Sequence, residues 1–247
     1  MILKGKNAVV YGAAGMMGGA VARAFGAEGA RVFLAGRSQE SLERVAAEIA
    51  ANGGAAETAI VDALDQRSVE AHAEQVVQSA GSLDISFNAI SINAEQNVPL
   101  TDMPLDAFLR PVDEACRTHF ITATAAARRM TVQGSGVIIM LSASSAVETR
   151  HQMGGFSPAC ASIEALTRGL AGEVGRQGVR VVGLRCNFTP ETMPGVTDSD
   201  VAQLVRDTIL GRLPRLAEVA ATAVYLASDA AGAMSGTYVN LTCGAVQ

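Results

Sequence analysis

Three glycines at three-residue spacing constrain what this chain can fold into more than any other feature of its sequence. Gly12, Gly15 and Gly18 follow an apolar run at residues 8–11, which is typical of a buried parallel strand. From Met17 onward, apolar residues recur at helical spacing. A Gly-rich turn alone would say little, but a strand before it and a helix after it form the layout that binds a dinucleotide pyrophosphate. The stretch therefore predicts such a site, with the helix N-terminus facing the anion.

Strand and helix patterns alternate along the rest of the chain. We expect further strands at residues 31–35, 59–61, 83–88, 136–141, 179–184 and 237–241. Helices are expected between them, among others at residues 103–130, 157–176, about 201–210 and about 216–227. Asp65 can cap the helix that follows the third strand. The alternation predicts an α/β fold, a Rossmann-type doubly wound parallel sheet of seven strands with helices on both faces.

Composition bounds the kind of protein and its partners. A length of 247 residues, 49% of them apolar, fits one dinucleotide-binding domain over residues 1–247. Residues 186–200 are dense in Pro, Gly, Thr and Asp, so we expect 186–212 to form a substrate loop or lid. A net charge of −5 without a basic run argues against nucleic acid or an anionic membrane surface as a partner. No apolar run reaches membrane-spanning length and no signal-peptide pattern is present, so we expect a cytoplasmic protein.

Two positions bear on the type of dinucleotide. Sites that prefer NAD usually place an acid at the end of the second strand, where it bonds the ribose 2′-OH. Here that place holds Ala35, Gly36 and Arg37, followed by Ser38. A guanidinium without a competing acid suits a 2′-phosphate, so we expect NADP(H), although Arg37 can also be read as a solvated loop arginine. Asp62, after the third strand, can accept from the adenine amino group or simply cap its loop.

Several segments resemble the short-chain dehydrogenase/reductase family, and the resemblance covers essentially the whole chain. YGAAGMMG at residues 11–18 resembles the family's TGxxxGxG loop, with spacing nearer to its TGxxGxxG variant. LDISFNAIS at 83–91 resembles LDxLVNNAG, and VIIMLSASS resembles IVNISS. Residues 211–244 resemble GRxxxPEEVAxxVxFLASDxAxxxTGxxxxVDGG. The resemblance implies the family's fold and assigns cofactor contacts to Gly12, Gly15, Met17, Gly18, Arg37, Ser38, Asp62, Ala63, Asn88, Ala89, Cys186 and Asn187.

The family's chemistry rests on a tyrosine, a lysine, a serine and an asparagine. Aligning the family's YSASKAALEAL with FSPACASIEAL places Phe156 at the tyrosine position and Cys160 at the lysine position. The serine, thirteen residues before the tyrosine, falls on Ala143. The helix alignment puts the asparagine on Ala115. All four positions are therefore changed, and because phenylalanine has no ionisable group, Phe156 cannot transfer a proton.

No shift of the alignment restores these residues. The two lysines, Lys4 and Lys6, precede the first strand, and the chain has no tyrosine between Tyr11 and Tyr225. Ser142 and Ser144 flank the serine position, but strand alternation points them away from it. The family's PG pair beside the nicotinamide is replaced by Cys186 and Asn187.

Other side chains can be weighed as substitutes. His151, five residues before Phe156, titrates in a suitable range but can be a solvated loop histidine. Cys160 can act as an acid or nucleophile if its pKa is depressed, although buried cysteine is commonly a small hydrophobe. Arg185, at the end of the sixth strand, can bind an anionic substrate or pair with a neighbouring acid.

Three alternative functions are compatible with these residues. The first is an NADP(H)-binding oxidoreductase whose acceptor, such as an imine or an activated alkene, needs no tyrosine acid. The second is a cyclase, isomerase or dehydratase that uses the fold as a pocket, and the third is an inert binding or regulatory protein. The resemblance also implies a small-molecule substrate and a homo-oligomer, a tetramer or dimer packed through helices 103–130 and 157–176. No metal site is expected, since the four cysteines lack CxxC pairing.

Overall fold

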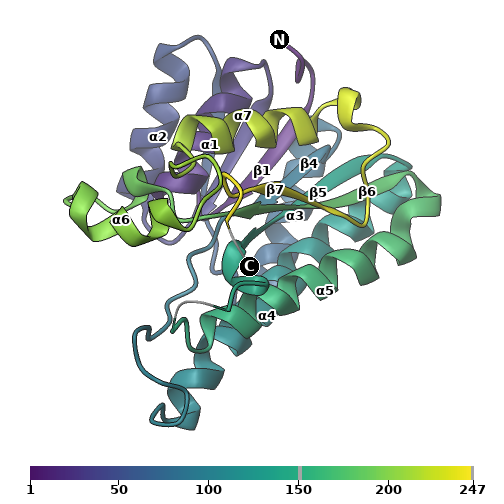
Figure 1. Ribbon diagram of the computed structural model, residues 1–247. Coiled ribbons are helices and arrows are strands. Elements are labelled where there is room, and N and C mark those ends of the chain that lie inside the picture. Colours follow the sequence, from purple (N-terminus) through teal and green to yellow (C-terminus); the bar gives the residue numbers. More distant parts are fainter. Residues whose placement is uncertain (150–151, 246–247) are drawn as a thin grey trace.

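A seven-stranded parallel sheet organises the part of the chain that the computed structural model describes, residues 1–149 and 152–245 (Figure 1). Its strand order is β3-β2-β1-β4-β5-β6-β7, and every pairing is parallel. The strands are β1 (Asn7–Tyr11), β2 (Arg31–Gly36), β3 (Ala55–Ile60), β4 (Ile85–Asn88), β5 (Gly136–Ala143), β6 (Val179–Cys186) and β7 (Tyr238–Leu241). The predicted fold class and strand number are confirmed.

Helices cover both faces of the sheet, as Figure 1 shows. One apolar cluster joins the sheet to α1 (Met16–Ala27), α2 (Gln39–Ala51) and α7 (Leu216–Ala227). A second cluster joins the other face to α3 (Gln66–Ala80), α4 (Leu105–Gln133) and α5 (Phe156–Val174). None of the helices in the described ranges is both long and apolar enough to cross a bilayer.

Strand β1 lies inside the sheet, between β2 and β4, and its side chains belong to both clusters. Ala8 and Val10 belong to the cluster under α1 and α7, whereas Val9 and Tyr11 belong to the cluster under α3, α4 and α5. All four are buried. This alternation is why the apolar run at residues 8–11 reads as a strand buried on both faces.

Most expected elements are found within about three residues of their expected bounds, and two differ more. The strand expected at 59–61 is β3, which starts at Ala55 and ends at Ile60. It is an edge strand paired only with β2, so half-exposed Ala, Glu and Thr side chains replace the expected apolar run. The helix expected at about 201–210 is α6 (Asp198–Arg206). A capping box between Thr197 and Asp200 starts it one turn before its first apolar residue.

The segment 186–212, expected to form a loop or lid, follows β6 and contains α6. Its far end is fastened to the segment after β7, since the Ile209 N–H donates to the Gly244 carbonyl (2.9 Å) and Leu210 N–H to that of Cys243 (3.1 Å). The side chain of Glu191 accepts from the Leu216 N–H (3.3 Å) at the start of α7. Segment 186–212 is therefore tied to the domain at several points.

Candidate functional site

The strand order reverses at β1, which pairs with β2 on one side and β4 on the other. The connection from β1 runs through α1 on one face, and the connection from β4 runs through α4 on the opposite face. Diverging connections leave a crevice beyond the carboxyl ends of the two strands, where ligands of open α/β sheets bind. The Gly-rich loop lies at this point of the fold.

Glycine is required at two positions of this loop. Gly12 has φ +73°, and a Cβ placed on it would lie 2.7 Å from the Ala89 carbonyl oxygen at the end of β4. A Cβ on Gly18 would overlap the Gly12 carbonyl, so Gly18 lets α1 approach the turn. Gly15 precedes α1 and supplies no side-chain cap. The first N–H groups of α1 are therefore left for an anion at the crevice, while Met17 packs against the core behind them.

The end of β2 presents Arg37 and Ser38 to solvent. Within residues 1–149 and 152–245, the Arg37 guanidinium has no ion-pair or hydrogen-bond partner. Ser38 donates only to the Ser41 hydroxyl (3.1 Å). A cation free of local carboxylates at this place can pair with a phosphate.

The end of β3 carries Asp62 and Ala63. One carboxylate oxygen of Asp62 accepts from the Leu64 N–H (3.0 Å), so this side chain does cap its own loop. Its exposed position also leaves it open to a ligand. Ala63 is buried beside it. An adenine contact at Asp62 stays a prediction.

Asn88, at the end of β4, is buried and fully engaged. Its amide nitrogen donates to the Thr122 hydroxyl (2.9 Å) and the Thr118 carbonyl (3.3 Å) of α4. Its amide oxygen accepts from the Ile90 N–H (3.0 Å). Asn88 therefore fixes the turn after β4, and the neighbouring Ala89 carbonyl, against α4 and the Gly-rich loop.

The other half of the crevice holds the positions that the alignment relates to the family's catalytic residues. Ala143 ends β5, and Phe156 and Cys160 occupy the first turns of α5. The backbone of Ala143 contacts the Cys160 sulfur. Ala115 faces α5 from α4 within the buried cluster. The structure thus brings the four positions to one region; His151 lies outside the described residues.

The thiols of this region are buried. Burial raises the pKa of the Cys160 thiol to about 12 and that of Cys186 to about 12 as well. Both therefore carry their proton at neutral pH, which disfavours a nucleophilic thiolate. His119, one turn after Ala115, donates its Nδ1–H to the Ala115 carbonyl (3.1 Å), and burial lowers its pKa to about 4.

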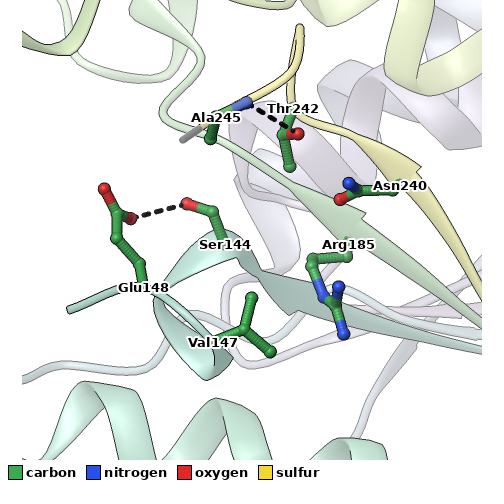
Figure 2. A pocket seen from close by; sticks show the side chains of 7 residues that line it. All are labelled: Ser144, Val147, Glu148, Arg185, Asn240, Thr242 and Ala245. Atoms are coloured by element: carbon green, nitrogen blue, oxygen red, sulfur yellow. Dashed lines mark hydrogen bonds between the residues drawn. The ribbon is translucent and has the colours of Figure 1, made fainter. Parts of the chain in front are cut away.

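Arg185 pairs with a neighbouring acid rather than standing free. Its Nε and Nη2 bond both oxygens of Glu164 (2.7 and 2.6 Å), a carboxylate buried on α5. Ser142 donates to the same carboxylate (3.2 Å). Figure 2 shows Arg185 among the side chains of a small pocket at the carboxyl ends of β5, β6 and β7, with Ser144, Glu148, Asn240 and Thr242.

Sequence reasoning missed Glu164 as that partner. Glu164 and Arg185 lie 21 residues apart, and only the packing of α5 on β6 brings them together. A charged residue directly after Ile163, on the buried face of a helix, was the available signal.

Asn187 directly follows Cys186, the last residue of β6. Its amide oxygen accepts from the Phe188 N–H (2.7 Å) and from the Ser144 hydroxyl (3.4 Å). The Ser144 hydroxyl has one proton, which it can donate instead to the Glu148 carboxylate (3.1 Å). Ser144, Asn187 and Glu148 therefore form a hydrogen-bonded cluster at this end of the crevice.

Comparison with known proteins identifies the fold family. The family described as Enoyl-(Acyl carrier protein) reductase matches residues 12–245. The uncharacterized oxidoreductase YxbG of Bacillus subtilis (strain 168) is 31% identical over 95% of this chain and 88% of its own length. A short-chain type dehydrogenase/reductase from Mycobacterium marinum superposes with a TM-score of 0.87 at 31% identity, covering 98% of this chain and 95% of that one. The chain belongs to the short-chain dehydrogenase/reductase family.

Membership in the short-chain dehydrogenase/reductase family makes this chain a relative of oxidoreductases that use nicotinamide cofactors. L-Rhamnose 1-dehydrogenase (NAD(P)(+)) of Azotobacter vinelandii (strain DJ / ATCC BAA-1303) is 32% identical over 96% of this chain and 94% of its own length. Its name states a small-molecule substrate and either dinucleotide. The family thus supports the crevice at β1 and β4 as a dinucleotide site.

Proposed function

We propose that this short-chain dehydrogenase/reductase binds NADP(H) and acts as an oxidoreductase on an acceptor that needs no tyrosine acid. The observation that carries the cofactor preference is the end of β2, where an exposed Arg37 without a carboxylate partner in the described chain occupies the place that NAD sites give to an acid. A 2′-phosphate there gains a charge-assisted hydrogen bond. A relative whose name states NAD(P)(+) is 32% identical over 96% of this chain.

The residues at the adenosine end fit this group. Gly12 and Gly18 leave the room that a Cβ would fill, and α1 begins without a side-chain cap. Arg37 and Ser38 would hold the 2′-phosphate, with Asp62 beside the adenine. When bound, the cofactor supplies the hydride chemistry.

The proposed chemistry follows from the four aligned positions. Ala115, Ala143, Phe156 and Cys160 carry no group that donates a proton near neutral pH except a thiol whose pKa burial raises to about 12. A positioned acid is worth roughly 10²–10⁴-fold in rate. A protonated imine, an activated alkene, or an acceptor protonated by water avoids that loss. His151 and Cys160 remain the proposed substitutes should the acceptor need a donor.

Two other functions fit the fold. A cyclase, isomerase or dehydratase would turn over without consuming cofactor, and an inert binding protein would bind NADP(H) or a partner without turnover. The test is NADPH absorbance at fixed protein with a panel of iminium compounds, activated alkenes and simple ketones, alongside product analysis without cofactor. Substrate-dependent NADPH loss with the first two classes and little with ketones supports the proposal; turnover only without cofactor consumption contradicts it.

We also propose a cytoplasmic homo-oligomer, dimer or tetramer, packed through α4 and α5. An apolar groove between these helices is lined by Cys116, Phe120, Ser162 and Leu166, and the exposed Phe120 ring stands beside it. Sedimentation velocity of the wild type and Phe120→Asp tests this. A monomeric wild type would contradict it.

A further inference from the structure

Asn187 follows β6 directly, at the position of the glycine in the family's PG pair. Its backbone is fixed, because its N–H donates to the Leu241 carbonyl of β7 (3.4 Å) and its carbonyl accepts from the Thr189 hydroxyl (3.3 Å). The side chain is half-buried. The parallel register pairs Cys186 with Ala143, so Asn187 lies one residue beyond the level of the family's serine position.

The two ends of the Asn187 amide have different surroundings. Its oxygen accepts from the Phe188 N–H (2.7 Å) and from the Ser144 hydroxyl (3.4 Å). Because a backbone N–H can only donate, the amide atom beside Phe188 must be the oxygen, which fixes the orientation of the amide. The amide nitrogen has no partner within residues 1–149 and 152–245. The fold therefore holds a pair of N–H donors in place at the carboxyl ends of β5 and β6.

Fixed N–H donors stabilise negative charge that develops during a reaction. An amide N–H binds such a charge but keeps its own proton near neutral pH. The aligned positions beside it supply no acid either, since Ala143 and Phe156 have no ionisable group and burial raises the pKa of the Cys160 thiol to about 12. Asn187 and these positions together can stabilise an oxyanion but cannot protonate it.

The acceptor classes of the proposed function differ in the charge that develops on them. A hydride added to an iminium carbon cancels a positive charge, so N–H donors oppose the bound cation and do not stabilise the transition state. A hydride added to the β-carbon of an α,β-unsaturated ketone moves the alkene electrons through the α-carbon onto the carbonyl oxygen, as an enolate. N–H donors stabilise that oxygen most when its charge is greatest. The donors of Asn187 therefore favour the unsaturated ketone.

We propose that the Asn187 amide nitrogen binds the carbonyl oxygen of an α,β-unsaturated ketone or aldehyde and so selects this class of acceptor over iminium compounds. The inference rests on the proposed function, because the hydride comes from NADPH. The β-carbon gains the hydride, and the enolate held by Asn187 takes a proton from water at its α-carbon. The saturated carbonyl compound, hydroxide and NADP⁺ are the products.

Asn187→Asp is the most informative variant. It keeps an oxygen for the Phe188 N–H and the Ser144 hydroxyl but replaces the N–H donors by an anionic oxygen. Asn187→Gly restores the family's residue and removes the donors without adding a charge. Asn240→Asp is the matched control, because it makes the same change at an exposed position of the neighbouring strand β7 (Figure 2).

NADPH consumption with 2-cyclohexen-1-one and with a cyclic iminium compound is the first measurement. With the ketone, we expect kcat to fall by about 10²-fold or more in Asn187→Asp and to stay unchanged in Asn240→Asp. With the iminium compound, Asn187→Asp is expected to be at least as active as the wild type. Equal losses with both acceptors, or no loss with the ketone, would overturn the inference. A wild type that reduces only the iminium compound would overturn it and leave the proposed function standing.

Binding of 4-nitrophenolate, an aromatic oxyanion, gives a readout that needs no turnover. At pH 8, where this probe is largely ionised, absorbance titration is expected to show binding at least about tenfold weaker in Asn187→Asp and Asn187→Gly than in the wild type and Asn240→Asp. Equal binding by all four proteins, or none by the wild type, would overturn the inference. The expected pattern in a wild type that binds no NADPH would support the role of Asn187 and overturn the proposed function.

Discussion

Arg185 and Glu164 form a two-point ion pair beneath the carboxyl ends of β5 and β6, with Nε–Oε1 and Nη2–Oε2 distances of 2.7 and 2.6 Å. The carboxylate is buried, and the guanidinium lies over the Tyr238 ring at 5.6 Å. The sequence left open whether Arg185 binds an anionic substrate or pairs with a neighbouring acid, and the structure shows the pairing. It is therefore a structural element of the fold.

Breaking this pair on one side is expected to destabilise the protein more than removing both charges. Glu164→Leu or Arg185→Met alone leaves a desolvated charge and costs about 3 kcal/mol or more, whereas the double variant costs less than either. Urea unfolding of the three variants measures this. Additive losses would show that the two side chains act independently.

Gly12 is expected to tolerate alanine far less well than Gly81. Both have positive φ, +73° and +85°, so both variants meet a conformational cost of about 1 kcal/mol. Only at Gly12 does the new methyl also meet the Ala89 backbone, whereas Gly81 faces open space. We expect Gly12→Ala to cost about 2 kcal/mol more and to lose NADPH binding. Equal unfolding midpoints and equal affinities would contradict this reading of the turn.

The thiols are expected to differ in reactivity. Cys116 is exposed, whereas burial raises the pKa of both Cys160 and Cys186 to about 12. Iodoacetamide at pH 8 followed by peptide mass spectrometry is expected to label Cys116 in the Phe120→Asp variant, whose α4–α5 groove is uncovered, and to spare the other two until urea is added. Rapid native labelling of Cys160 would indicate a thiolate and revive its role as a nucleophile.

Two buried histidines predict a loss of stability in acid. Burial lowers the pKa of His72 and of His119 to about 4, against an unfolded value near 6.5. The unfolded chain binds more protons between these values, so the free energy of unfolding is constant above about pH 6.5, falls towards pH 4, and levels off below it. Each histidine contributes up to about 3 kcal/mol to that fall.

Urea midpoints from pH 7.5 to 4 measure the effect. His72→Gln and His119→Gln each remove one titrating imidazole, so each is expected to flatten the curve relative to its own value at pH 7.5. Curves parallel to the wild type would show that carboxylates alone cause the acid dependence.

The sequence predicted elements in proportion to how much of each is buried. Strand β1 and helix α7 were predicted almost to the residue because their apolar side chains form continuous patterns. The first half of β3 was missed because an edge strand needs no apolar run, and only its pairing with β2 defines it. Helix α6 buries a single residue in its length, Val201, so its start depended on the cap at Thr197.

The candidate site divides in the same way. The Gly-rich turn was predictable because local backbone geometry requires its glycines. Gly12 has a positive φ, and the backbone approaches both Gly12 and Gly18 too closely for a side chain. The pairing of Arg185 with Glu164 and the use of the Phe188 N–H by Asn187 were not, because each depends on where the protein places a partner side chain. The sequence shows which polar groups the site contains, whereas the packing of the protein determines which of them have a hydrogen-bond partner.

We propose that the crevice selects NADP(H) through Arg37. Titration calorimetry of the purified protein with NADPH, and with NADH in parallel, tests it most directly. We predict NADPH binding about tenfold or more tighter than NADH, with the difference lost in Arg37→Ala. Equal affinities for the two dinucleotides, or no binding of either, would contradict the account.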